Sequence, residues 1–162
     1  MHLFKMAQPN IQLTSAPSKI VLGATLLIVG CSIYLLFRSK SLNLYQWCST
    51  LGLSTVIDDA RFCVQDWYIP NFIKFSLPDG LYVAAYILIM DYIWQDDENF
   101  IKHIVISSVP LFTIISEILQ YFKLVKGTFD NIDLIFYTFP LVAYYCYKYN
   151  FNKFYKLKIQ KL

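Results

Sequence analysis

The chain has 162 residues, of which 57% are hydrophobic, 18% aromatic and only 15% charged. A soluble domain of this size usually carries about a quarter charged residues, so this composition, with a mean hydropathy of +0.45, argues against a soluble domain and favours a membrane protein. The net charge of +3 does not indicate nucleic-acid binding. The cysteines lack the spacing of a zinc site, and Cys48 and Cys63 could form a disulfide only if their loop faces an oxidising compartment.

Four apolar segments are each long enough to cross a bilayer, which takes about 20 residues of helix. The first runs without a charge between Lys19 and Arg38, and it is too long for the apolar part of a signal peptide. We therefore predict an all-α, polytopic membrane protein, a bundle of four transmembrane helices that forms a single membrane domain over residues 20–149. The predicted spans cover residues 20–37, 76–94, 104–122 and 132–149, with an N-terminal tail at 1–19 and a basic amphipathic tail at 150–162.

The second predicted span begins with a helix-start signature. Ser76 is followed three residues later by Asp79, and Pro78 fits the first turn of a helix because it has no N–H to leave unpaired. Asp79 is therefore expected either to cap this helix or to bind a ligand. Pro110 and Pro140 lie in the middle of the third and fourth spans, where membrane helices tolerate proline.

Residues 41–75, between the first two spans, are the least apolar part of the chain. Charged side chains alternate there with apolar positions and with Trp47 and Trp67. This pattern predicts an amphipathic segment, including a short helix, that lies at the membrane surface.

Four spans would place both termini on the same side of the membrane. Eight lysines near the span ends lie on that side against six basic residues on the other, which favours cytoplasmic termini although the flanks of the first span alone argue the other way. The tail lysines, with aromatic residues between them, could also bind an anionic leaflet. The eight are Lys5, Lys19, Lys102, Lys148, Lys153, Lys156, Lys158 and Lys161.

The same topology brings several polar residues to one face of the membrane. The start of the second span, the end of the third and the start of the fourth must meet there. Carboxylates at short range need a cation, a metal or a shared proton to coexist, so we interpret this rim as a candidate ligand-binding site. Its predicted residues are Asp79, Glu117, Gln120, Lys126, Asp130 and Asp133.

Glu117 is the candidate least explained by local structure. It shares a helical face with Gln120, and it lies about 7.5 Å along the helix from the end of its span, at roughly 1.5 Å per residue. A capping role is excluded because Glu117 lies near the C-terminal end of its helix. The alternative to ligand binding is a structural hydrogen bond or an ion pair, with Lys126 or Arg61 as the partner.

Other polar residues have simpler explanations available. Asp130 and Asp133 could simply cap the fourth span instead of binding a ligand. Asp91, one turn before the end of the second span, is expected at the membrane interface. His2 and His103 lie in a tail and an interfacial loop, so neither is assigned to catalysis.

One segment of the chain is similar to a known family. The motif EILQ at 117–120, followed by KGTFDNID at 126–133, resembles the VanZ-like superfamily of small bacterial membrane proteins. Members of that family have a Glu and a Gln ending one membrane helix, a basic residue in a short loop, and two aspartates opening the next helix. The resemblance implies a bacterial cytoplasmic membrane and a cell-envelope role, and one member is associated with resistance to a glycopeptide antibiotic. The matching residues are Glu117, Gln120, Lys126, Asp130 and Asp133.

We predict an envelope protein that binds or modulates a cell-wall or lipid-linked ligand at this rim. Glu117 and Gln120 would be the interior contacts, with Asp130 and Asp133 at the mouth. No nucleophile, cofactor or metal motif is evident, so a binder without cofactor or metal is favoured over a membrane enzyme that uses carboxylates as acid and base or as metal ligands. A third alternative is an accessory subunit with a membrane-protein partner. The lipid bilayer is an expected partner, and nucleic acid is not.

Overall fold

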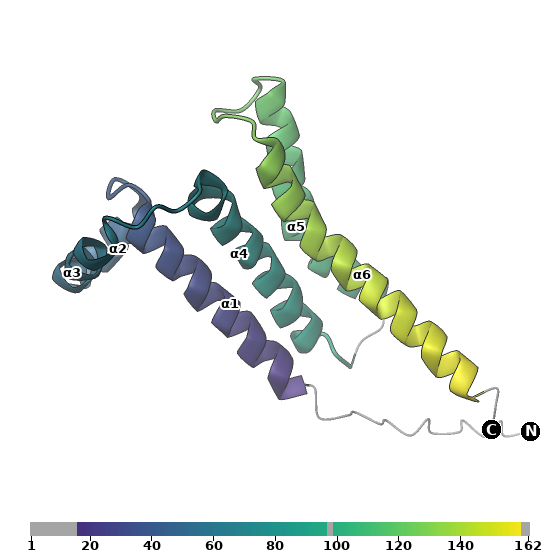
Figure 1. Cartoon of the computed structure of the whole chain (residues 1–162). Helices are drawn as coiled ribbons and strands as arrows, with labels where there is room; N and C mark the ends of the chain where they lie inside the picture. The colour runs from purple at the N-terminus through teal and green to yellow at the C-terminus, as the bar shows by residue number, and fades with distance from the viewer. Residues whose placement is uncertain (1–15, 97–98, 160–162) are drawn as a thin grey trace, which may run out of the picture.

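The computed structural model describes residues 16–96 and 99–159, which form six helices and no strand. Four long helices make a bundle in which α4 contacts α1 on one side and α5 and α6 on the other (Figure 1). Two short helices lie at the end of α1. The bounds are α1 Ala16–Phe37, α2 Asn43–Thr50, α3 Ser54–Val64, α4 Asn71–Ile93, α5 Phe100–Tyr121 and α6 Asn131–Ile159.

Among the described residues, three helices are long and apolar enough to cross a membrane, so the chain is a helical membrane protein. They cover Ser18–Phe37, Asn71–Ile93 and Phe100–Tyr121, with mean hydropathies of 2.5, 1.4 and 1.6. The prediction of four such helices is therefore corrected to three. The fourth, α6, is long enough, but Asp133, Lys148 and five tyrosines between residues 132 and 149 make its described part less apolar than the other three.

The two predicted tails are covered in part. Residues 1–15 and 160–162 lie outside the described residues, and α6 continues as one helix through Ile159. The structure does not describe the side chains of Lys153, Lys156, Lys158 and Lys161, which are predicted to bind a leaflet.

Helix α4 begins at Asn71, five residues before the predicted start at Ser76. Pro70 is the N-cap residue, with φ −56° and ψ 147°, and its carbonyl oxygen accepts hydrogen bonds from the backbone N–H groups of Ile73 and Lys74. Pro78 is then an interior residue, which a membrane helix tolerates when neighbouring groups compensate for the lost hydrogen bond. Asp79 lies about two turns inside α4 and therefore does not cap it, so the predicted capping role is wrong.

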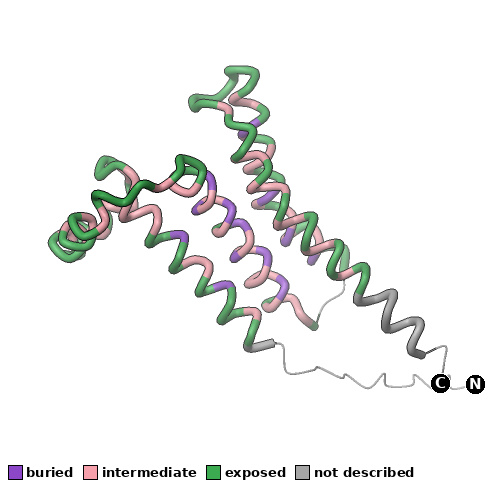
Figure 2. Tube along the Cα trace, in the orientation of Figure 1, coloured by how far each residue is buried: buried purple, intermediate pink, exposed green. Residues whose placement is uncertain are grey.

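The core of the bundle is a small apolar cluster centred on α4. Val83 and Ile87 of α4 and Ile106 of α5 are at most 2% exposed. Many large apolar side chains on the outer faces of the helices are exposed instead (Figure 2). An apolar exterior around a small core is what a lipid-facing bundle requires, since a soluble protein rarely exposes such large apolar patches.

Two glycines bring α1 close to α4. A Cβ at Gly23 would lie 2.9 Å from the Ile89 side chain, and a Cβ at Gly30 would lie 3.3 Å from the Pro78 carbonyl oxygen. Small residues of this kind let membrane helices approach and pack by van der Waals contact. The α1–α4 contact therefore places the end of α1, with Arg38, beside the first turns of α4.

The predicted short helix between the first two spans is a pair of helices, α2 and α3. The Lys40 Nζ lies 2.7 Å from the Asp58 carboxylate, which also accepts a hydrogen bond of 2.9 Å from the Tyr45 hydroxyl. The hydrogen bond between Lys40 and Asp58 raises the pKa of the lysine and lowers the pKa of the aspartate. Cys48 and Cys63 are free thiols, so the possible disulfide does not form here.

Candidate functional site

The six predicted rim residues lie at one end of the bundle. Figure 1 shows that α4 begins, α5 ends and α6 begins at this end. The six residues differ in burial: Glu117 is buried, three are partly buried, and two are exposed on the α5–α6 loop. The partly buried residues are Asp79, Gln120 and Asp133, and the exposed ones are Lys126 and Asp130.

Glu117 on α5 is 5% exposed and contacts the start of α6. Its Oε2 accepts a long hydrogen bond of 3.4 Å from the backbone N–H of Asp130. Neither predicted ion pair is formed among the described side chains, because Lys126 is exposed and Arg61 donates to the Arg38 carbonyl oxygen at 2.8 Å. Glu117 therefore has hydrogen-bonding capacity left over inside the bundle.

Two of the predicted residues shape the α5–α6 loop. The Asp130 Oδ1 accepts a 2.8 Å hydrogen bond from the backbone N–H of Ile132, so the predicted capping role of Asp130 is confirmed. The Gln120 side chain lies against Gly127, whose backbone has a φ of 148° that residues other than glycine rarely adopt. Gln120 thus supports the loop.

The remaining carboxylates surround Tyr137 of α6. Asp79 on α4 and Asp133 on α6 interact electrostatically with each other, and both interact with Glu117. The Tyr137 side chain hydrogen-bonds Asp79, and the Arg38 guanidinium lies 3.8 Å from the same carboxylate. We call Asp79, Glu117 and Asp133 the acidic rim.

Two polar atoms, one in the acidic rim and one next to it, are buried without a hydrogen-bond partner among the described residues. They are the Oδ1 of Asp133 and the Oγ of Ser76, a residue that is 1% exposed. Gly80 packs directly on Phe136. Ser76 lies one turn before Gly80, and Asp133 lies nearly one turn before Phe136, so the two unpartnered atoms are at the same level of the α4–α6 contact.

An apolar groove runs from this level along the α4–α6 contact. Its volume is about 420 Å³, within the range of small-molecule sites, which are usually apolar with a few polar groups. We call it the α4–α6 groove. It is lined by Leu77, Gly80, Leu81, Ala84, Ile87 and Leu88 of α4 and by Phe136, Phe139, Pro140, Ala143, Tyr144 and Tyr147 of α6.

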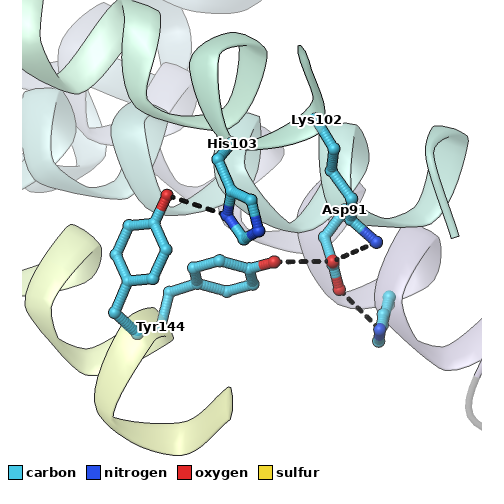
Figure 3. Close-up of polar contacts among 6 residues, drawn as sticks. Asp91, Lys102, His103 and Tyr144 are labelled. Atoms are coloured by element: carbon cyan, nitrogen blue, oxygen red, sulfur yellow. Dashed lines mark hydrogen bonds and ion pairs between the residues drawn. The ribbon is translucent and has the colours of Figure 1, made fainter. Parts of the chain in front are cut away.

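A second polar cluster, which the sequence did not predict, lies at the opposite end of the bundle. Asp91 of α4 is 8% exposed and contacts Lys19 of α1 at 2.6 Å, Lys102 of α5 at 3.3 Å and the hydroxyl of Tyr144 of α6 at 2.7 Å (Figure 3). All four long helices thus meet at one carboxylate. Asp91 lies near the end of α4, where the sequence places it, but its side chain points into the bundle.

His103 belongs to the neighbouring contact between α5 and α6. Its ring stacks on Tyr145 at a centroid distance of 5.8 Å, and its Nδ1 lies 3.3 Å from the tyrosine hydroxyl. Ser107 lies 2.9 Å from the same hydroxyl. These contacts join the two helices beside the Asp91 cluster (Figure 3).

The two ends of the bundle therefore differ in charge. At one end Asp91 is paired with two lysines. At the other end the acidic rim has one arginine nearby. No three His, Cys, Asp or Glu side chains in the described parts of the chain are grouped to hold a metal ion. No family model, curated protein or solved structure matches the chain. The fold and the two clusters define a class, a helical membrane protein with an ion-paired end and an acidic end.

Proposed function

We propose that this protein binds a cationic group of a membrane or cell-wall ligand at the acidic rim. The observation that carries the proposal is the charge imbalance there. Asp79, Glu117 and Asp133 come from three helices and interact with one another, whereas Arg38 is the one basic group within salt-bridge distance of them among the described side chains. Carboxylates at membrane depth normally pair with an opposite charge, and a bound ammonium group would supply it.

An organic cation suits this rim better than a metal ion. The carboxylates are not grouped as metal ligands within the described residues, and an apolar groove opens beside them. A ligand with an ammonium group and an apolar part would contact both features. The resemblance of residues 117–133 to VanZ-like proteins supports a bacterial envelope ligand, either lipid-linked or part of the cell wall.

We further propose that α6 crosses the bacterial cytoplasmic membrane as a fourth helix, with both termini in the cytoplasm. Residues 131–159 extend about 43 Å at roughly 1.5 Å per residue, which exceeds the hydrocarbon thickness of about 30 Å. The helix packs against α4 and α5, so its less apolar side chains are shielded in part. Tyr147 and Tyr149, at the end of the predicted span 132–149, suit a membrane interface.

The topology is tested with a tag at each terminus and a single thiol at Cys63, the other three cysteines being replaced by serine. Both tags are expected to resist protease added to intact cells, while Cys63 on α3 reacts with a membrane-impermeant maleimide. If α6 does not cross the membrane, the two tags will be found on opposite sides, which would contradict the four-helix arrangement.

Ligand binding is tested by Glu117→Gln, which keeps an acceptor for the Asp130 N–H but removes the charge. Protein in detergent is incubated with equal amounts of phosphatidylethanolamine and phosphatidylglycerol carrying the same acyl chains, and the adducts are counted by native mass spectrometry. We expect the wild type to prefer the amine lipid and the variant to lose about tenfold of that preference, as for one charged hydrogen bond of about 1.5 kcal/mol.

The matched control is Asp59→Asn, the same change at an exposed position on α3. It is expected to keep the wild-type preference, and all three proteins should melt at the same temperature. The proposal is wrong if the wild type shows no preference for the amine lipid. If Glu117→Gln keeps the preference, Glu117 has a structural role only.

A further inference from the structure

We propose that the α4–α6 groove holds one acyl chain of a lipid whose headgroup amine lies at the acidic rim. This inference rests on the proposed function, because it takes the cationic group at the rim as given. It adds the chemical class of the ligand, an amine-headed lipid from the leaflet at that end of the bundle. The length and lining of the groove and the buried polar atoms next to its rim end support it.

The length of the groove matches one leaflet. From Leu77 to Leu88 it extends about 16 Å along α4, at roughly 1.5 Å per residue. That is close to half of the roughly 30 Å hydrocarbon core of a bilayer. A chain that starts at the rim would therefore end near the middle of the membrane, where acyl chains of that leaflet end.

The groove is open toward the surroundings of the bundle. Phe139 and Tyr147, which line it on α6, are each 69% exposed. A lipid could therefore enter sideways from the bilayer without separating the helices. Gly80 has no side chain to fill the α4–α6 contact, and Phe136 occupies the space where a Cβ would lie.

Two buried hydrogen-bonding atoms lie next to the rim end of the groove, in residues adjacent or close in sequence to its lining residues Leu77 and Phe136. The Ser76 Oγ and the Asp133 Oδ1 are both buried and have no partner within the described residues. Ser76 lies on the same face of α4 as Gly80 and Ala84, which line the groove, because residues four apart share a helical face. Asp133 precedes Phe136 on the corresponding face of α6. An ammonium group can donate to both atoms, whereas a lipid without a donor in its headgroup would leave them unsatisfied at a cost.

The test fills the groove without touching the rim. Ala143→Phe adds an aromatic ring to the lining of the groove, and Ala24→Phe makes the same change at an exposed position of α1. Native mass spectrometry measures retention of dioleoyl phosphatidylethanolamine, and a separate titration measures binding of glycerophosphoethanolamine, which has the headgroup but no acyl chain. We expect Ala143→Phe to lose about tenfold in lipid retention, or about 1.4 kcal/mol, because the ring takes the space of the acyl chain and removes its van der Waals contacts with the groove; the variant should keep the wild-type affinity for the headgroup probe.

Each outcome separates the two proposals. If Ala143→Phe and Ala24→Phe retain the lipid equally while the headgroup probe binds, the groove inference is overturned and the proposed function stands. If neither the probe nor the lipid binds the wild type, the proposed function fails and the inference falls with it. Should Ala143→Phe not fold, a phosphatidylethanolamine with a photoreactive group on its acyl chain is crosslinked to the wild type. Crosslinks confined to residues 77–88 and 136–147 support the inference, and crosslinks spread evenly over α1 and α5 overturn it.

Discussion

Replacing Asp91 with alanine is expected to lower the free energy of unfolding by about 3 kcal/mol, since removing one partner of a buried ion pair leaves the other charge uncompensated. The carboxylate contacts Lys19, Lys102 and the Tyr144 hydroxyl. Lys102 dominates the expected loss because its side chain is 3% exposed, whereas that of Lys19 is 34% exposed and more easily solvated. Unfolding by sodium dodecyl sulfate in mixed micelles, followed by circular dichroism, measures the change.

A double variant distinguishes charge from packing at this position. Asp91→Leu combined with Lys102→Met replaces the buried pair by apolar side chains of similar size, a change that is often neutral. We expect it to recover more than half of the stability lost in Asp91→Ala. Asp59→Ala, at an exposed position of α3, serves as the control and should change stability little. A loss in Asp91→Ala no larger than in this control would show that the cluster does not join the helices.

The Asp91 cluster also shows why the sequence predicted one polar end of the bundle and missed the other. The acidic rim was predictable because its residues lie near helix ends that any antiparallel arrangement brings together. Asp91 looked interfacial because it lies one turn before the end of its helix. Lys19 and Lys102 were counted as signals of membrane orientation, although both are engaged by Asp91. Only the rotation of each helix about its axis decides between these roles, and periodicity does not fix it when apolar residues surround the whole helix.

Local sequence signals predicted where the helices lie but not the residues at which they begin and end. The sequence Ser76–Asp79 has the chemistry of a helix start, yet α4 already begins at Asn71 because Pro70 provides an entry and the residues between are compatible with a helix. The helix α6 was expected to end near residue 149 but continues to Ile159. In both cases the helix is correctly placed but longer than predicted. The prediction that Asp79 and Asp133 lie at the same end of the bundle did not depend on either boundary.

Replacing Gly80 with alanine is expected to destabilise the protein by about 2 kcal/mol, as for an overpacked core. The new Cβ would lie 2.7 Å from Cδ1 and 3.0 Å from Cβ of Phe136. Rotation of the phenyl ring could relieve the first contact, but the second involves an atom fixed to the backbone, so α6 must move. Gly30→Ala is the matched comparison, because its nearest contact is 3.3 Å and alanine favours a helix by about 1 kcal/mol. The same unfolding titration in mixed micelles measures both.

Removing the ring gives the converse test. If the clash with Phe136 is the cause, Gly80→Ala combined with Phe136→Ala should be more stable than the sum of the two single changes predicts. Additive effects in this cycle would contradict a direct contact between α4 and α6 at Gly80. Because Ser76 lies one turn before Gly80 and Asp133 nearly one turn before Phe136, an outward shift of α6 in Gly80→Ala also separates the two unpartnered atoms. Retention of the amine lipid is therefore expected to fall together with stability in this variant, whereas in Asp91→Ala, at the far end of the bundle, the folded fraction should keep its lipid preference.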